Sequence, residues 1–283
     1  MKALSGKARL AGVMGWPVAH SRSPRLHGFW LERYGIDGAY VPLAVRPEDL
    51  GPALAALPRL GFRGVNLTVP HKEAALAIIA EASPEARRIG AVNTVVVGSD
   101  GRLIGHNSDG FGFLANLRQG APDWHASDGP AVVLGAGGAA RAVAAALLDQ
   151  GVAEVRLVNR TLGRAQGLAR DLGGPCRVMA WAERAAALAD AAVVVNTTTL
   201  GMTGAQALAL DLSRLPPQAV VNDIVYTPLE TPLLAEARRR GNRVVDGLGM
   251  LLHQARPGFE AWFGVMPEVT PDCRAFMLED LRP

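Results

Sequence analysis

The feature that most constrains the fold of this chain is a glycine-rich turn between an apolar run and an alanine-rich segment. Residues 131–134 (AVVL) are typical of a buried parallel strand, and Gly135, Gly137 and Ala140 follow in a G-x-G-x-x-A pattern. The alanine-rich segment predicts a helix that stops at Gly151, and residues 154–158 predict a second strand. These elements form a βαβ unit, which predicts a doubly wound, Rossmann-type α/β domain.

The same turn is a candidate dinucleotide site. Glycines permit a tight turn and a close backbone approach, and the N–H groups at the start of the helix attract a pyrophosphate. Glycine-rich turns also arise from helix–strand packing alone. Here the strand before, the helix after and the second strand are all present, which favours the dinucleotide interpretation.

The end of the second predicted strand indicates which dinucleotide is preferred. Asn159, Arg160 and Thr161 stand there with Arg164 close behind, where NAD-binding domains usually carry Asp or Glu. A carboxylate would repel a 2′-phosphate, whereas a guanidinium pairs with it in a bidentate manner. The alternative is a solvated arginine pair at a helix start; the position after a Rossmann strand favours NADP.

Composition excludes several classes of protein. A chain of 283 residues suits two domains, and its net charge of +3 is spread without a basic run that would indicate nucleic-acid binding. The two cysteines form no CxxC pattern and the six histidines show no metal-ligand spacing, so we expect a reduced, cytoplasmic protein without a metal site. No apolar run is long enough to cross a membrane.

The first third of the chain alternates predicted strands and helices, namely strands 9–14, 39–45 and 63–69 and helices 23–34, 47–60 and 70–82. Ser23 before Pro24 predicts a helix N-cap, and Ser21 lies in the loop just before it. Paired hydroxyls beside backbone donors also suit a carboxylate or polyol ligand. Asn66 and Thr68 share one strand face, and Lys72 lies in the first helical turn after it, where α/β sheets bind ligands. Many such lysines are merely exposed.

Two further strands, 91–97 and 102–106, are joined by a turn and lead into Asp109, which is placed as a helix cap before a helix at 111–117. The remaining expected elements, after the βαβ unit, are helices 165–172, 232–240 and 271–281, a helix from 247, and strands 177–179, 191–195, 219–225 and 243–246.

Ten short motifs, in order, resemble those of the shikimate dehydrogenase family over nearly the whole chain. They are residues 20–24 (HSRSP), 66–72 (NLTVPHK), 90–94 (GAVNT), 107–110 (NSDG), 135–139 (GAGGA), 159–161 (NRT), 196–198 (NTT), 201–202 (GM), 223–226 (DIVY) and 249–254 (GMLLHQ). Three positions, Gly28, His71 and His106, depart from the usual pattern of this family.

The resemblance implies reduction of 3-dehydroshikimate to shikimate with NADPH, by a monomer or homodimer. Residues 1–108 and 248–283 would form the substrate-binding domain and residues 109–247 the NADP-binding domain, with the active site in the cleft between them. Lys72 and Asp109 would be the catalytic pair. The implied substrate contacts are Ser21, Ser23, Asn66, Thr68, Lys72, Asn93, Asp109, Tyr226 and Gln254. The implied cofactor contacts are Gly135, Ala136, Gly137, Gly138, Ala139, Asn159, Arg160, Thr161, Arg164, Thr197, Ile224 and Gly247.

The chemistry is consistent with these roles. Hydride addition to a ketone leaves an alkoxide, and the ammonium of Lys72 could supply its proton, while Asp109 would mainly orient and bind a hydroxyl. Three alternatives remain: a quinate/shikimate dehydrogenase using NAD, a non-catalytic nucleotide-sensing protein, and a tetrahydrofolate dehydrogenase relative. The paired serines and Gln254 argue against the last.

Overall fold

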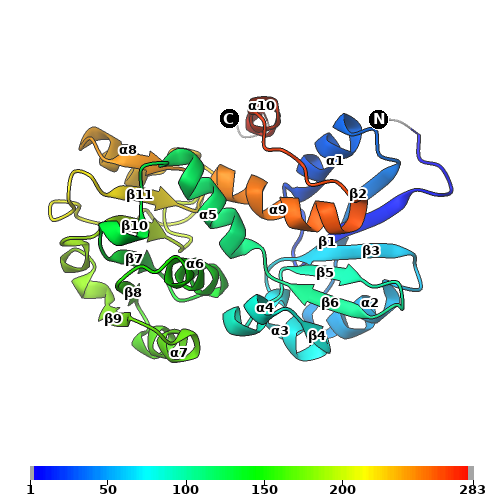
Figure 1. Cartoon of the computed structure of the whole chain (residues 1–283), viewed down its shortest axis with the longest axis horizontal. Helices are drawn as coiled ribbons and strands as arrows, with labels where there is room; N and C mark the ends of the chain where they lie inside the picture. The colour runs from blue at the N-terminus through cyan, green and yellow to red at the C-terminus, as the bar shows by residue number, and fades with distance from the viewer. Residues whose placement is uncertain (1–2, 280–283) are drawn as a thin grey trace. The chain divides into compact units, whose positions relative to one another are not determined.

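The computed structural model describes residues 3–279, and the chain divides into two compact units (Figure 1). One unit runs to Ser108 and resumes at Gln254, and the other spans Asp109–His253. The divisions fall at the start of α5 (Asp109–Gly120) and inside α9 (Gly247–Phe263). The first unit is therefore built from two separate stretches of the sequence, and the second from one continuous stretch.

The first unit contains a mixed six-stranded sheet in the order β2-β1-β3-β5-β6-β4. Its strands are β1 (Arg9–Gly15), β2 (Gly38–Ala44), β3 (Phe62–Leu67), β4 (Glu81–Ala82), β5 (Thr94–Val97) and β6 (Leu103–His106). Strand β1 is parallel to both β2 and β3, whereas β5 is antiparallel to β3 and β6. No helix separates β5 from β6, because a short turn is enough to join antiparallel strands.

Helices from both stretches of the sequence belong to this unit. They are α1 (Ser23–Arg33), α2 (Leu50–Ala56) after a 3₁₀ turn (Pro47–Asp49), α3 (His71–Ile78), α4 (Pro84–Ile89) and α10 (Pro271–Glu279). The end of α9 fixes the core, because the indole N–H of Trp262 donates to the carbonyl of Val95 at 3.0 Å. Gly64, at φ +150°, has no room for a Cβ, since that indole and the Val95 carbonyl fill the space.

The second unit contains a fully parallel sheet in the order β12-β11-β10-β7-β8-β9. Its strands are β7 (Ala131–Leu134), β8 (Val155–Asn159), β9 (Cys176–Ala180), β10 (Val193–Asn196), β11 (Val220–Asp223) and β12 (Arg243–Val245). Its further helices are α6 (Gly138–Asp149), α7 (Leu162–Leu172) and α8 (Pro232–Arg239). Numbered within the unit, this is the 3-2-1-4-5-6 strand order of doubly wound sheets. The order in which strands are added reverses between β7 and β10, which is the switch point of the sheet.

Local expectations from the sequence were wrong at several points in the first unit. The helix expected at 47–60 is a 3₁₀ turn followed by α2, which ends before Pro58, a residue without an N–H to continue it. The helix expected to run to residue 82 ends at Ile78, and Glu81–Ala82 pair with β6 instead, as β4. Helix α4 was not expected.

The predicted capping role of Ser23 was also wrong. Ser23 is the first residue of α1, the N-cap is Arg22, and no side chain caps this helix. The backbone N–H of Ser23 instead donates to Ser21 Oγ at 3.4 Å, just before the helix.

Candidate active site

The topology of the first sheet brings the predicted substrate residues to one edge. Strands β1 and β3 are parallel, so the loops that follow them, with Ser21 after β1 and Thr68 and Lys72 after β3, leave at the same edge. The backbone N–H of Trp16 donates to the carbonyl of Val69 at 3.1 Å and joins the two loops. Strand β5 is antiparallel and begins at this edge, with Thr94 opposite Asn66.

A chain of side-chain hydrogen bonds runs along this edge. The Tyr40 hydroxyl donates to Asn66 Oδ1 at 2.6 Å. Asn66 Nδ2 donates to the Asn93 carbonyl and to Thr94 Oγ1, both at 3.1 Å. Two predicted substrate residues, Asn66 and Asn93, are thus connected, and Tyr40, which the sequence analysis missed, holds the side chain of the first.

The same network continues to the residue before Asp109. Asn93 Oδ1 accepts from the backbone N–H of Ser108 at 3.0 Å, and Asn93 Nδ2 donates to Ser108 Oγ at 3.1 Å. The N–H of Val92, next to Asn93, donates to the carbonyl of Lys72 at 2.8 Å. Val92 therefore holds the backbone of Lys72. Its neighbour Asn93 holds Ser108, the residue before Asp109.

The ionisable residues predicted for the substrate site and its surroundings differ in solvent exposure. Lys72 is half-buried and Asp109, the first residue of α5, is buried. Burial raises the pKa of Tyr40 well above its ordinary value, with a smaller opposing effect from the Ser23 side chain. Burial also lowers the pKa of His27, whose ring stacks on Tyr40 at 3.8 Å between centroids, to about 3. Both rings therefore stay neutral at physiological pH.

In the second unit, the glycine-rich turn lies at the switch point of the parallel sheet. Gly135 follows β7 with φ +117°, and a Cβ there would lie 2.6 Å from Oγ1 of Thr197, the residue after β10. Thr197 donates to the carbonyl of Leu134 through both its N–H, at 3.0 Å, and its hydroxyl, at 2.6 Å. Glycine is therefore required at position 135 by the protein itself, and the turn stands where doubly wound sheets bind ligands.

Unlike Gly135, the next two glycines, Gly137 and Gly138, are not required by packing. A Cβ at Gly137 or Gly138 would meet no atom within 4 Å, so the packing of the chain does not demand glycine at either position. Gly137 is the N-cap of α6, and Gly138 and Ala139 begin its first turn, where the N–H groups have no partner within the helix. Open space beside a helix N-terminus fits the pyrophosphate of a dinucleotide.

The residues after β8 present positive charge. Asn159 ends the strand and its Nδ2 donates to the carbonyl of Thr161 at 2.9 Å, while Thr161 begins α7 as its N-cap. Arg160 and Arg164 are exposed, and among the described residues neither forms an ion pair with a carboxylate. An exposed guanidinium pair at this position fits a 2′-phosphate.

A buried carboxylate, whose role the sequence analysis missed, organises the ends of β10 and β11. Asp223 accepts from Asn196 Nδ2 at 2.9 Å, from the N–H of Val225 at 3.0 Å and from the Thr231 hydroxyl at 2.7 Å. Burial raises the pKa of Asp223 to about 6, against the effect of these hydrogen bonds. Its place in the 223–226 motif was the only available signal for it.

Asp223 also fixes the segment that carries two predicted site residues, Ile224 and Tyr226. The N–H of Ile224 donates to the carbonyl of Asn196 at 3.1 Å. Gly247 packs directly against the carbonyl of Ile224, where a Cβ would not fit, so these two predicted cofactor residues are neighbours. Tyr226 and Gln254 are half-buried.

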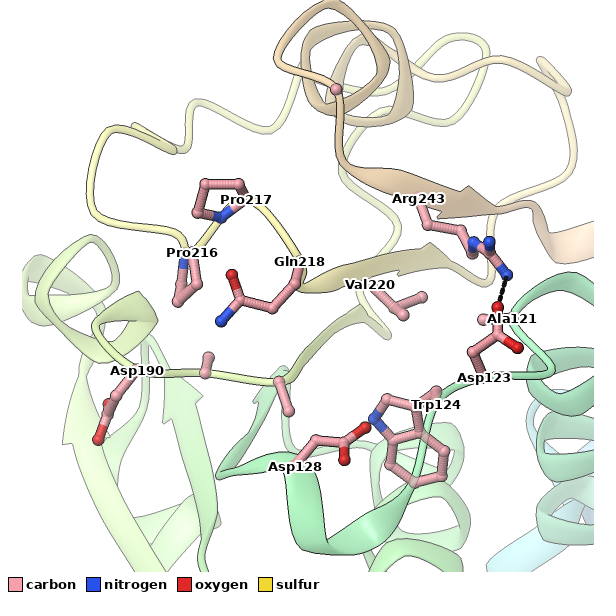
Figure 2. Close-up of a pocket in the computed structure, with 13 residues that line it drawn as sticks. Ala121, Asp123, Trp124, Asp128, Asp190, Pro216, Pro217, Gln218, Val220 and Arg243 are labelled. Carbon is pink, nitrogen blue, oxygen red and sulfur yellow. Dashed lines mark ion pairs between the residues drawn. The ribbon is translucent and has the colours of Figure 1, made fainter.

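A pocket of about 590 Å³ lies in the second unit, at the opposite edge of its sheet (Figure 2). Trp124 and Asp128, before β7, line it together with Gln218, before β11. Arg243, which begins β12, forms an ion pair with Asp123 at 3.2 Å there. The pocket is thus at the amino ends of the strands and includes three carboxylates, so it is not the phosphate site.

Within residues 3–279, no helix is long and apolar enough to cross a membrane. In the same part of the chain, no group of three or more His, Cys, Asp or Glu residues could hold a metal ion.

A parallel sheet in this order, with a glycine-rich turn at its switch point, defines a dinucleotide-binding α/β protein. Three family models match the chain: the shikimate dehydrogenase substrate binding domain at residues 13–95, shikimate / quinate 5-dehydrogenase at 119–218, and the shikimate 5'-dehydrogenase C-terminal domain at 247–271. The chain belongs to the shikimate dehydrogenase family.

Similar proteins cover almost the whole chain. Shikimate dehydrogenase (NADP(+)) of Paramagnetospirillum magneticum is 66% identical over 97% of this chain and 100% of its own length. Shikimate 5-dehydrogenase from Thermus thermophilus, solved with NADP(H) and shikimate, is 42% identical, with a TM-score of 0.84 over 97% of this chain and 98% of that one. Quinate dehydrogenase from Corynebacterium glutamicum, solved with NAD, is 34% identical, with a TM-score of 0.90 over 96% and 99%.

Proposed function

We propose that this protein catalyses the reduction of 3-dehydroshikimate to shikimate with NADPH. The observation that carries the proposal is the open space beside Gly137 and Gly138, at the switch point of the parallel sheet. The chain is also 66% identical to an NADP(+)-dependent shikimate dehydrogenase. When bound, the cofactor supplies the hydride. The residues of the chain bind and orient both molecules and provide the proton.

On the cofactor side, backbone N–H groups of Gly135–Ala139 hold the pyrophosphate and the guanidinium groups of Arg160 and Arg164 hold the 2′-phosphate. Asn159 and Thr161 shape that phosphate site, since their hydrogen bond fixes the turn between β8 and α7. The remaining proposed cofactor contacts are Thr197, Ile224 and Gly247.

On the substrate side, Ser21 and Ser23 bind the carboxylate. The hydroxyls are recognised by Asn66, Thr68, Asn93, Asp109, Tyr226 and Gln254. As hydride reaches the carbonyl carbon, negative charge develops on its oxygen, and Lys72 Nζ donates a proton to that oxygen. Asp109 orients the substrate by accepting from one of its hydroxyls.

A quinate dehydrogenase using NAD is the second candidate, favoured by the similarity to the Corynebacterium glutamicum enzyme. Quinate carries an additional hydroxyl, so one of the two serines would have to be replaced to make room, yet both are present. The arginines after β8 also favour the 2′-phosphate of NADP over the bare ribose of NAD.

Steady-state kinetics with each pairing of shikimate or quinate with NADP⁺ or NAD⁺ tests the proposal. We expect the highest kcat/KM for shikimate with NADP⁺. A higher kcat/KM for quinate with NAD⁺ would establish the second candidate instead.

We extend the proposal to a cytoplasmic protein that is a monomer or a homodimer. Both cysteines, Cys176 and Cys273, are free thiols, as is usual in a reducing compartment. Cell fractionation and sedimentation velocity would test the two statements.

A further inference from the structure

The peptide group that joins β7 to the glycine-rich turn is held at both ends by residues of the neighbouring strands and loops. Its carbonyl, that of Leu134, accepts from Thr197 after β10, through the backbone N–H at 3.0 Å and the hydroxyl at 2.6 Å. Its N–H, that of Gly135, donates to the carbonyl of Val158 on β8 at 2.8 Å. The plane of this peptide is therefore fixed from both sides of the switch point.

Only one of these three hydrogen bonds comes from a side chain. The two backbone bonds continue the parallel ladders that β7 forms with β10 and β8, and many sequences could form them. The Thr197 hydroxyl adds a second donor to the Leu134 carbonyl, whose two lone pairs are then both used. The same hydroxyl oxygen lies 2.6 Å from the place where a Cβ of residue 135 would stand, so it packs directly against the glycine.

Building on the proposed function, we propose that Thr197 is a positioning residue for the pyrophosphate of the cofactor and acts through the Leu134–Gly135 peptide. Gly135 has φ +117°, and the chain after it turns directly into the N-terminus of α6. A rotation of the peptide before Gly135 would therefore redirect the N–H groups of Gly137, Gly138 and Ala139. The Thr197 hydroxyl prevents that rotation and keeps these donors aimed at the phosphates.

The Thr197 hydroxyl does not itself hold a phosphate. A threonine hydroxyl has a single proton to donate, and Thr197 gives it to Leu134. An ionised phosphate oxygen needs donors, so the hydroxyl contributes to pyrophosphate binding only indirectly. Any direct contact of this hydroxyl with the cofactor is with a donor group, such as a ribose hydroxyl or the carboxamide N–H₂.

The residues on either side of Thr197 keep it in place. Asn196 is completely buried, and its Oδ1 accepts from the N–H of Thr198 at 3.1 Å and from the Thr198 hydroxyl at 2.7 Å. The path of the loop therefore does not depend on the Thr197 side chain, which can be altered without moving the backbone that carries it.

Calorimetric titration of the whole protein with NADP⁺ and two of its fragments tests the proposal. The first fragment, 2′-phospho-ADP-ribose, lacks only the nicotinamide, whereas 2′-AMP lacks the pyrophosphate as well. Thr197→Val keeps the branched shape and removes the hydroxyl, and the Leu134 carbonyl retains its backbone partner, so the variant should fold. We expect the Kd values for NADP⁺ and 2′-phospho-ADP-ribose to rise about three- to tenfold, as for the loss of one hydrogen bond. The Kd for 2′-AMP should stay unchanged.

Two control variants separate the hydroxyl from the loop. Thr197→Ser keeps the hydroxyl and should restore wild-type affinity for all three ligands. Thr199→Val makes the same chemical change at an exposed position two residues further along the loop, and its Kd values should equal those of the wild type.

The three ligands distinguish this role of Thr197 from others. Weaker binding of NADP⁺ alone would show a direct contact with the nicotinamide, and equal weakening of all three ligands would show a general loosening of the unit. Either result, unchanged Kd values for Thr197→Val, or Thr197→Ser binding as weakly as Thr197→Val would overturn the inference and leave the proposed function intact. A wild-type protein that does not bind NADP⁺ would overturn both.

Discussion

Asn196 donates to the carboxylate of Asp223 at 2.9 Å, and both side chains are completely buried where β10 and β11 end. The pair ties together the loops that carry Thr197 and Ile224. A buried carboxylate without a cation has a thermodynamic cost, which here takes the form of a raised pKa.

The free energy of unfolding should therefore depend on the ionisation of Asp223 between pH 5 and pH 7. The carboxyl would ionise near its ordinary pKa of 3.8 in the unfolded chain, but has a pKa of about 6 in the folded protein. The folded state therefore holds the proton more tightly, and the free energy of unfolding falls as the pH rises through this window. We expect Asp223→Asn to lack this contribution, so that wild type loses about 1 kcal/mol more than the variant from pH 5 to pH 7. Urea unfolding at both pH values measures it; equal losses in the two proteins would contradict it.

The ionisation of His27 should make the free energy of unfolding depend on pH in the opposite direction. Its pKa is about 3 in the folded protein and 6.5 ordinarily, so the unfolded chain takes up the proton first as the pH falls. The stability that the neutral ring provides is therefore lost on acidification, by about 2 kcal/mol from pH 7 to pH 5. His27→Phe keeps an aromatic ring beside Tyr40 and should remove this loss. Chemical denaturation of wild type and variant at the two pH values checks the prediction, and an unchanged loss in the variant would refute it.

The open space at Gly137 gives a prediction about the cofactor. Gly137→Ala adds a methyl group that meets no protein atom within 4 Å and stands in extended backbone, so the fold should tolerate it. The methyl group would block a phosphate, and we expect the KM for NADP⁺ to rise at least about tenfold, equivalent to the loss of one or two charge-assisted hydrogen bonds.

Gly163→Ala in α7 is the matched control, because its methyl group is equally unopposed. It should raise stability by about 0.5–1 kcal/mol through helix propensity and leave the KM for NADP⁺ unchanged. Equal KM values for the two variants and the wild type would show that the cofactor does not approach Gly137.

Replacing Lys72 and replacing Asp109 should change different kinetic parameters. Lys72→Met removes the proton donor, and we expect kcat to fall by about 10²–10⁴-fold with little change in the KM for shikimate. Asp109→Asn should chiefly raise that KM, because its assigned role is to orient a hydroxyl. Steady-state kinetics with NADP⁺ held at saturation distinguishes the two. Equal losses of kcat at unchanged KM would mean that Asp109 takes part directly in the proton transfer.

The second sheet could be predicted well from the sequence because its strands are short and apolar, and helices follow β7, β8 and β11. Residues 131–134 are β7 as expected, and α6 ends just before Gly151, which has φ +82°. Buried parallel strands appear in a sequence as continuous apolar runs, so these strands can be recognised from the local sequence alone.

The first sheet was harder to predict because its details depend on long-range pairing. The two residues of β4 look helical in the sequence and become a strand only by pairing with β6. Ser23 looked like a cap, yet it is the first residue of α1 and no side chain caps this helix. The residues expected at the substrate site were found by resemblance to a family, whereas the side chains that hold them, Tyr40 and Thr94 among them, emerge only from the fold.

The division of the chain has a consequence for its biosynthesis. The core around β3 and β5 depends on Trp262, which a ribosome adds only after the entire second unit has been made. Until then, the part of the first unit that ends at Ser108 lacks the indole that packs at Gly64, and its core is incomplete. The continuous second unit already has all of its strands at that stage. During translation, the younger part of the polypeptide can reach its native form before the older part does.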